Sequence, residues 1–500
     1  MSKLPIIEEW PTTLTPADIF HALRDEPGVF FLDSGMAGGR SAGVFFLDSG
    51  MAGGRSGRYS FAGSQPFLTF TSRGRRITIT RSDAVENCSD DPFDTLGRLL
   101  DEYKLDRNDA RMPFTGGAVG YISYDAGRHL EKLPRNATDD LKLSEFRFGF
   151  YDVIFAYDHL ENRGYIVSTG FPALDETARI DRAVHRIGEF RQRMSATRPV
   201  DSAMEVPSEV EAPPAVKSNF TRKSYMAAVE RARQYIIAGD IFEVNLSQRF
   251  EVELKFAPPE LYQRLRRINP APFAAFLNCG EFSIISASPE RFLKLDGIAV
   301  ETRPIKGTRK RGGTPEEDHR LAAELIASEK DRAENMMIVD LERNDLGRVC
   351  RYGSVKVTEL AALETFPTVF HLTSTVTGEL AEGKDRIDLL KAAFPGGSIT
   401  GAPKVRSMEI IDELEPVRRG IYTGAIGWLG FNGDLDLNIA IRTIVARGRK
   451  TWFQVGGAVT FDSDPEAEYQ ETLHKARALF QALGGGKLGV GATHESPAPP

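Results

Sequence analysis

The sequence predicts an α+β protein whose core is a large mixed β-sandwich surrounded by helices. Residues 218–484 alternate helical patterns with short β-rich runs, and several of these runs form hairpin-like pairs. Interleaving of this kind favours a mixed α+β sandwich over a simple doubly wound sheet. With 500 residues, of which 41% are hydrophobic and 27% charged, the chain is long enough for two to four domains or one large composite core.

Five segments of the N-terminal part carry strand signals. They are 67–71, 76–80, 117–124, 153–157 and 165–169, the last of them after a turn at 162–164.

The C-terminal part contains both kinds of pattern. Helices are expected at 222–238, 260–269, 317–340, 386–394, 403–414 and 464–483. Between them are β-rich runs at 242–254, 274–277, 282–286, 291–303, 355–360, 422–429, 436–446 and 451–455.

A change of composition near the middle of the chain predicts two domains. Residues 197–217 are rich in proline, alanine, glutamate and serine, a composition that cannot bury enough apolar surface to fold by itself. We therefore expect an N-terminal domain over 1–195, a linker over 196–217, a second domain over 218–484 and a disordered tail over 485–500.

One segment of the chain is duplicated. The sequence GVFFLDSGMAGGRS at 28–41 recurs without change at 43–56. Two copies are too few for a solenoid, which needs about three or more. Only one copy can supply a given strand, and we expect it to be the second, because that copy runs directly into the strand-like segment 58–61.

Composition argues against several classes of function. The net charge of −7 leaves no basic footprint for nucleic acid or an anionic membrane. No apolar run approaches the roughly 18 residues of a membrane span, and the first ten residues lack the apolar region of a secretory signal. The three cysteines, Cys88, Cys279 and Cys350, have no zinc-site spacing and are typical of reduced thiols. These observations predict a cytoplasmic protein.

Lys306 is the first candidate for chemistry. It follows the β-rich run 291–303 in the segment Pro-Ile-Lys-Gly-Thr, where we expect a tight turn with few local counter-charges. A buried or cation-crowded lysine can lose its proton and become a nucleophile. On this spacing alone a solvated surface lysine is the commoner case. Whether Lys306 is a nucleophile therefore has to be judged from the other motifs of the chain.

Two expected helices carry pairs of carboxylates on one face. Asp331 and Glu334 are three residues apart, and Glu468, Glu471 and Lys475 form a similar stripe near the C-terminal end. Two carboxylate pairs suit a hard cation such as Mg²⁺, which takes one or two carboxylates and keeps several waters. Either helix taken alone would more often carry an ordinary solvated charged face.

Glycine-rich turns at 394–404, 424–430 and 456–457 match neither a phosphate-binding P-loop nor a dinucleotide fingerprint. Their backbone N–H groups can still hold a carboxylate. His371 stands in an apolar run, where a lone histidine is more often a core residue than a catalyst.

Taken together, these segments resemble the chorismate-utilising enzymes, in that family's order and spacing. The segments are SASPERF (286–292), RPIKGT (303–308), EKDRAENMMIVDLERNDLG (329–347), FPGGSITGAPK (394–404), AIRT (440–443) and DPEAEYQETLHKA (464–476). In the N-terminal part, FLDSG (46–50) and GRYSFAG (57–63) are also similar to the family.

The resemblance implies a role for each candidate. Glu290 matches the general acid that protonates a departing hydroxyl, Lys306 a nucleophile and His371 a histidine near the substrate ring. The positions that match substrate-binding residues are Tyr422, Arg442, Gly456, Gly457, Lys475 and Ser398. The cofactor implied is Mg²⁺, with Glu334 and Glu471 as direct ligands and Asp331 and Glu468 in support.

The resemblance also implies the reaction, and here Lys306 is decisive. A lysine at this position can attack C2 of chorismate, so that ammonia enters at C4 and gives 4-amino-4-deoxychorismate, on the route to p-aminobenzoate and folate. Members with alanine there direct ammonia to C2 and produce anthranilate, which is the alternative. Glu243 stands where water-using members carry a lysine base, so hydration of chorismate is disfavoured.

A catalytically inactive binding subunit is a third alternative. The complete set of metal-site carboxylates, together with Lys306, argues against it. No glutaminase domain is visible, so a separate glutaminase subunit is the expected source of ammonia. The FLDSG segment resembles a region that binds tryptophan in a relative, which makes tryptophan a candidate ligand of the N-terminal part.

Overall fold

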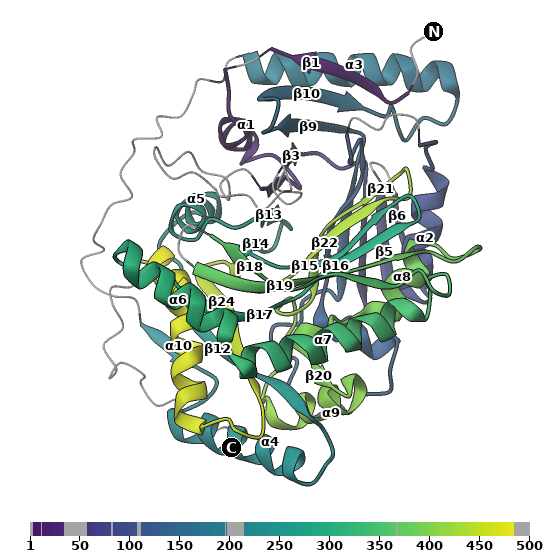
Figure 1. Ribbon diagram of the computed structural model, residues 1–500. Helices are drawn as coiled ribbons and strands as arrows, with labels where there is room; N and C mark the ends of the chain where they lie inside the picture. The colour runs from purple at the N-terminus through teal and green to yellow at the C-terminus, as the bar shows by residue number, and fades with distance from the viewer. Residues whose placement is uncertain are drawn as a thin grey trace.

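Two antiparallel sheets form the centre of the protein, with helices around them (Figure 1). The computed structural model describes residues 4–11, 13–34, 58–81, 84–107, 112–195, 197, 215–366 and 369–484. Within these residues each sheet has twelve strands. Buried side chains of β2, β9, β14 and β23 in one sheet share a core cluster with those of β7 and β21 in the other, so the sheets pack as a sandwich. The predicted α+β class with a β-sandwich core is confirmed.

The first sheet has the order β1-β10-β9-β3-β2-β13-β14-β23-β24-β12-β11, with β20 paired to β12. Its strands are β1 Ile6–Trp10, β2 Phe30–Asp33, β3 Tyr59–Gly63, β9 Val153–Asp158, β10 Arg163–Ser168, β11 Val216–Ser218, β12 Glu243–Glu253, β13 Phe273–Asn278, β14 Ser283–Ser288, β20 Gly401–Ala402, β23 Thr443–Arg447 and β24 Lys450–Val459.

The second sheet has the order β17-β19-β16-β15-β22-β21-β7-β8-β4-β5-β6, with β18 paired to β19. Its strands are β4 Leu68–Arg73, β5 Arg76–Arg81, β6 Ala84–Ser89, β7 Gly117–Ile122, β8 Phe146–Tyr151, β15 Arg291–Asp296, β16 Ala299–Arg303, β17 Ile305–Lys310, β18 Lys356–Thr365, β19 Val369–Glu379, β21 Ala425–Gly430 and β22 Leu435–Ile439.

The helices cover the faces and ends of the sandwich (Figure 1). They are α1 Pro16–Leu23, α2 Pro92–Glu102, α3 Glu176–Ser195, α4 Arg222–Ile237, α5 Pro258–Ile268, α6 Pro315–Ala327, α7 Glu329–Gly347, α8 Arg386–Ala393, α9 Lys404–Leu414 and α10 Pro465–Ala482, with short 3₁₀ turns η1 Tyr124–His129 and η2 Gly397–Ile399. None of the described helices is long and apolar enough to cross a membrane. The three cysteines are free thiols.

Both sheets continue across the composition break in the middle of the chain. In the first sheet β2 pairs with β13, and in the second β7 pairs with β21. Gly120 of β7 lies so close to β8 that a β-carbon there would stand 1.9 Å from the Arg147 carbonyl oxygen. Val216 and Lys217, the last residues of the expected linker, begin β11. The division into two domains therefore stays a prediction, while the sandwich itself is built by strands from both parts.

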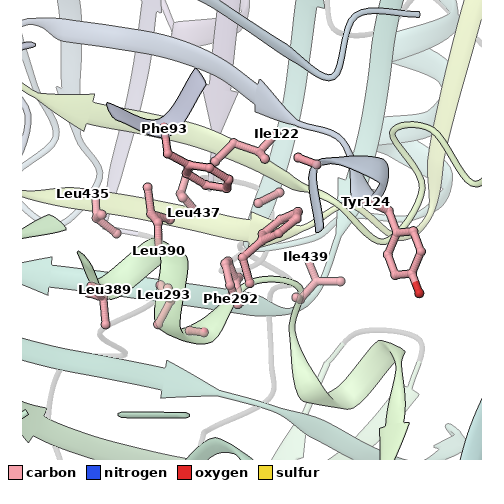
Figure 2. Close-up of a cluster of buried hydrophobic side chains, with 14 of the residues drawn as sticks. Phe93, Ile122, Tyr124, Phe292, Leu293, Leu389, Leu390, Leu435, Leu437 and Ile439 are labelled. Carbon is pink, nitrogen blue, oxygen red and sulfur yellow. The ribbon is translucent and has the colours of Figure 1, made fainter. Parts of the chain in front are cut away.

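The largest apolar cluster joins the two parts of the chain (Figure 2). Its labelled members come from α2, β7, η1, β15, α8 and β22: Phe93, Ile122, Tyr124, Phe292, Leu293, Leu389, Leu390, Leu435, Leu437 and Ile439. Burying each such side chain contributes about 1.5–3 kcal/mol relative to exposure. The backbone N–H of Ile439 donates to the carbonyl of Glu290 at 3.0 Å, so this cluster also fixes the backbone of a predicted catalytic residue.

The single helix expected over 317–340 is wrong, because the chain forms two helices there. Helix α6 ends at Ala327 and α7 begins at Glu329, with Ser328 between them in an extended conformation. The Ser328 hydroxyl accepts from the N–H of Asp331 and caps α7. Serine favours such caps because its side chain replaces a missing intrahelical hydrogen bond.

The first copy of the duplication supplies strand β2, with Phe30–Asp33 between β3 and β13. The expectation that the second copy would fill this place is therefore wrong. The copies are identical, so local sequence cannot choose between them. The first copy follows α1 closely, and Phe20 of α1 stacks on Phe31 at 5.1 Å. The second copy, most of the expected linker and the tail 485–500 lie outside the described residues.

Candidate active site

The predicted site residues come from both sheets and from the two helices α7 and α10. Helix α7 contacts β17 and β19 of one sheet, and α10 contacts β24 of the other (Figure 1). Asp464 caps the start of α10 by accepting from the N–H of Ala467, and Ser328 caps α7 in the same way. Each helix thus presents its carboxylates within its first two turns.

Lys306 lies in a bulged strand rather than in the expected turn. It is the second residue of β17, where the pairing with β19 shifts between Ile305 and Thr308. Gly307 has φ of +87°, and a β-carbon there would lie 3.1 Å from the side chain of Asp331. The bulge re-aims the Lys306 side chain, and the glycine lets α7 approach the strand.

Lys306 is also not short of counter-charge. Its ammonium donates to Oε1 of Glu243 at 2.6 Å, and the two side chains are 8% and 1% exposed. Burial alone lowers the pKa of Lys306, but Glu243 and then Glu334 raise it, and the result lies above the ordinary value. Lys306 is therefore charged in this structure. The sequence suggested otherwise because Glu243 is 63 positions away along the chain.

Glu290 lies at the corner between β14 and β15. Its Oε1 accepts from the Ser398 hydroxyl at 2.5 Å and from the N–H of Ile305 at 3.4 Å. Burial raises the pKa of Glu290 to about 7, although Ser398, the Ile305 N–H and Lys306 favour the charged form. A carboxyl with this pKa can donate a proton near neutral pH.

The two carboxylates on α7 differ in their surroundings. Asp331 accepts from Arg309 at 2.9 Å. Burial raises the pKa of Glu334 to about 7, although Lys306 favours its charged form. Lys330 of the same helix lies 3.8 Å from Glu334.

The two carboxylates on α10 lie beside the glycine pair of β24. A β-carbon at Gly457 would stand 3.0 Å from Oε2 of Glu468 and 3.3 Å from Oε1 of Glu471. Burial alone raises the pKa of Glu471, but an ion pair with Lys475 at 2.5 Å holds it below its ordinary value. Oε1 of Glu468 accepts from Ser463 at 2.6 Å, whereas its Oε2 is buried without a partner among the described residues.

These two pairs fit the donor set of a magnesium ion without forming a closed cage. Mg²⁺ takes one or two carboxylates and retains waters, and an unpartnered buried oxygen such as Oε2 of Glu468 is suited to such a water or ion. In the part of the chain that the structure describes, no three His, Cys, Asp or Glu side chains converge as a metal site. The ammonium of Lys330 on α7 is near enough to Glu468 and Glu471 to favour their charged forms.

Lys475 of α10 connects the predicted substrate-binding residues to the carboxylates. Lys475 donates to the Gly456 carbonyl at 2.9 Å, and Arg442 donates to the Lys475 carbonyl at 2.8 Å. Tyr422 is buried, which raises its pKa to about 12, and Arg442 acts on it electrostatically. A β-carbon at Gly456 would stand 2.5 Å from the Leu246 carbonyl oxygen of β12, so only glycine fits there.

His371 lies in β19, the strand that pairs with β17 of Lys306. Its Nδ1 is 2.8 Å from the Thr308 hydroxyl, and Phe366 packs edge-on against the ring. Burial, with Arg442 nearby, lowers the pKa of His371 to about 4. The imidazole is therefore neutral at neutral pH and can position a group but is not a cation.

Hydrogen bonds, ion pairs and electrostatic interactions thus connect the predicted residues into one region. The sequence did not reveal that Ser398 bonds to Glu290, nor that Glu243 bonds to Lys306. A third addition is Glu342, which accepts from Thr302 at 2.9 Å and whose pKa burial raises well above the ordinary value. Only the LERND segment, next to the predicted metal ligands, could have drawn attention to it.

Comparison with known proteins places the chain in a family. Residues 51–481 match the model of the chorismate binding enzyme family. A Bacillus subtilis protein named aminodeoxychorismate synthase component 1 is 44% identical over 427 residues, 85% of this chain and 89% of the relative. A Cereibacter sphaeroides protein named anthranilate synthase component 1 is 41% identical over 436 residues, 85% of this chain and 86% of the relative.

The fold agrees with this. The crystal structure of anthranilate synthase component I from Streptococcus pneumoniae superposes with a TM-score of 0.74 and 32% identity, covering 88% of this chain and 94% of that one. The chain belongs to the chorismate binding enzyme family, and the resemblance seen in its motifs is confirmed.

Proposed function

We propose that this protein aminates chorismate at C4, giving 4-amino-4-deoxychorismate with ammonia from a separate glutaminase subunit. The observation that carries the proposal is the placement of Lys306, whose amine is buried among carboxylates and acts electrostatically on Glu290. Names of relatives support the reaction, since proteins called aminodeoxychorismate synthase component 1 are 41–44% identical to this chain. Their designation as a component supports a partner subunit.

The chemistry assigns one role to each buried group. The Lys306 amine attacks C2, the ring double bonds shift and the C4 hydroxyl leaves as water with a proton from Glu290. Ammonia then attacks C4, the double bonds shift back and the lysine departs. Splitting one substitution into two displacements fixes the carbon that receives nitrogen.

The site must also bind the negatively charged carboxylates of the substrate. We assign Mg²⁺ to Glu334 and Glu471, with Asp331 and Glu468 in support, and it would neutralise the carboxylate on the ring. Arg442, with its planar guanidinium, and Lys475 are suited to hold the carboxylates of the substrate. Tyr422, Ser398 and the backbone at Gly456 and Gly457 would shape the remaining walls.

Amination at C2 to give anthranilate is the second candidate. It has the support of relatives named anthranilate synthase component 1, at 41% identity. An amine at position 306 would occupy C2 itself, which argues against this candidate. Tryptophan binding by the N-terminal part would accompany this second candidate function. The FLDSG segment at 46–50 lies outside the described residues.

One assay separates the two candidates. Purified protein is given chorismate, Mg²⁺ and ammonium, or glutamine with a glutaminase subunit, and the product is identified by mass and fluorescence. We expect 4-amino-4-deoxychorismate. Anthranilate as the main product would overturn the proposal.

A further inference from the structure

We propose that Glu243 is the proton acceptor that converts Lys306 into a nucleophile. This rests on the proposed function, because it supplies the neutral amine which that function requires. The two side chains come from opposite sheets, Glu243 from β12 and Lys306 from β17, and form an ion pair of 2.6 Å between them.

The pair is buried, and neighbouring segments hold the backbone of Glu243. Glu243 pairs with Ala402 of β20 on one side, and its carbonyl accepts from the Ser407 hydroxyl at 3.0 Å. A proton moving from Lys306 to Glu243 crosses a hydrogen bond that already exists, so no side chain has to rearrange.

The second oxygen of the carboxyl group is also informative. Oε2 of Glu243 is buried and has no hydrogen-bond partner among the described residues. A purely structural ion pair in a protein interior normally has all of its oxygens satisfied, because an unmet buried acceptor costs about 1–3 kcal/mol. Oε2 is therefore available to hold a proton while Oε1 stays bonded to the amine.

Three other carboxylates interact electrostatically with Lys306. They are Glu290, Glu334 of α7 and Glu471 of α10. Each already has a role: Glu290 protonates the leaving hydroxyl, and Glu334 and Glu471 are assigned to the metal. In the part of the chain described here, the hydrogen bond of Nζ goes to Glu243. Glu243 is thus the carboxylate that is both in contact with the amine and without another task.

The proton then completes a cycle. Transfer to Glu243 leaves a neutral Lys306 amine, whose lone pair forms the Nζ–C2 bond as the C4–O bond breaks and Glu290 gives its proton to the leaving water. Ammonia forms the C4–N bond, and the C2–Nζ electron pair returns to the lysine as a free amine. That amine recovers its proton from Glu243, and solvent restores the proton of Glu290.

The test uses the full-length protein with Glu243→Gln, which keeps the shape of the side chain but cannot accept a proton in the same way. Chorismate and Mg²⁺ are supplied without ammonia, and the covalent adduct on Lys306 is followed by mass spectrometry of the intact protein. We expect Glu243→Gln to slow adduct formation and lower kcat by roughly 10²- to 10⁴-fold, with little change in KM. Wild-type kcat/KM should fall at low pH, and this acidic limb should disappear in the variant.

Two further variants keep the result interpretable. Glu243→Asp retains a carboxylate and should restore part of the rate and the acidic limb, and it carries the test if Glu243→Gln does not fold. Asp152→Asn removes a buried carboxylate paired with Arg186 in the N-terminal part. It should lower the melting temperature without altering the pH profile.

The outcomes distinguish the two proposals. Adduct formation at the wild-type rate in Glu243→Gln would overturn the role of Glu243 and leave the proposed function intact. Faster adduct formation would also overturn it, since it would mean that Glu243 merely holds Lys306 in its charged form. Wild-type protein that makes anthranilate and no adduct would overturn the proposed function itself.

Discussion

The Ser398 hydroxyl donates to Oε1 of Glu290 at 2.5 Å, inside a sandwich that leaves the Glu290 side chain almost wholly buried. The serine comes from η2, in the glycine-rich segment after α8, and the glutamate from the corner between β14 and β15. Burial and this hydrogen bond act on the carboxyl in opposite directions. Burial raises its pKa and the serine favours the charged form, with a net value of about 7.

The first prediction is a pH dependence. A general acid donates only while it is protonated, so kcat/KM should fall as the pH rises through about 7. Ser398→Ala removes a bond that favours the charged form, which raises the pKa of Glu290 further and moves this basic limb to higher pH. Rates measured across the pH range check both points. A basic limb that does not move in Ser398→Ala would contradict the influence of Ser398 on the pKa of the general acid.

The second prediction concerns Lys306. Lys306→Ala should abolish amination at C4 and, because Glu243 is then buried without its partner, lower the free energy of unfolding by about 3–5 kcal/mol. Adding Glu243→Gln to the same protein removes the uncompensated charge, so stability should recover while activity does not. Denaturant unfolding and product analysis measure the two effects. An unchanged product and rate in Lys306→Ala would contradict covalent catalysis.

The third prediction tests the metal assignment. Glu334→Gln should raise the Mg²⁺ concentration needed for activity at least about tenfold and weaken Mg²⁺ binding measured by calorimetry. Glu329→Gln, on the exposed first turn of the same helix, is the matched control and should bind Mg²⁺ like wild type. An unaltered Mg²⁺ dependence in Glu334→Gln would remove this residue from the site.

The fourth prediction concerns the two halves of the chain. Because β2 pairs with β13 and β7 with β21, residues 1–195 expressed alone should not fold, and neither should 218–484. Circular dichroism and denaturant unfolding of each half check this. The full chain should unfold in one main transition. Independent, cooperative folding of either half would support two separable domains.

Much of the secondary structure could be predicted because its signals are local. Alternation of apolar and polar residues marked β4 and β5, and a short apolar run marked β9. The aspartate, proline and carboxylates at the start of α10 marked its first turn. The break between α6 and α7 was missed because Ser328 can cap a helix or lie within one, and packing of α7 against β17 and β19 favours the cap.

The same contrast between local signals and long-range packing applies to the candidate site. The sequence by itself determined which candidate carboxylates share a helix face, since the spacing of Asp331 and Glu334 and of Glu468 and Glu471 places each pair on one side of its helix. It also marked Lys306 and Glu290 through their motifs. These are statements about neighbours along the chain, and local geometry is enough to support them.

Only the tertiary structure decided the electrostatic environment of those residues, and with it the direction in which their pKa values shift. Lys306 was expected to lack counter-charges, yet it faces Glu243 from the opposite sheet, 63 positions earlier in the chain. The state of Glu290 likewise depends on Ser398, 108 positions later. Burial and electrostatic contact are set by groups that folding brings together, and no pattern within one segment contains that information.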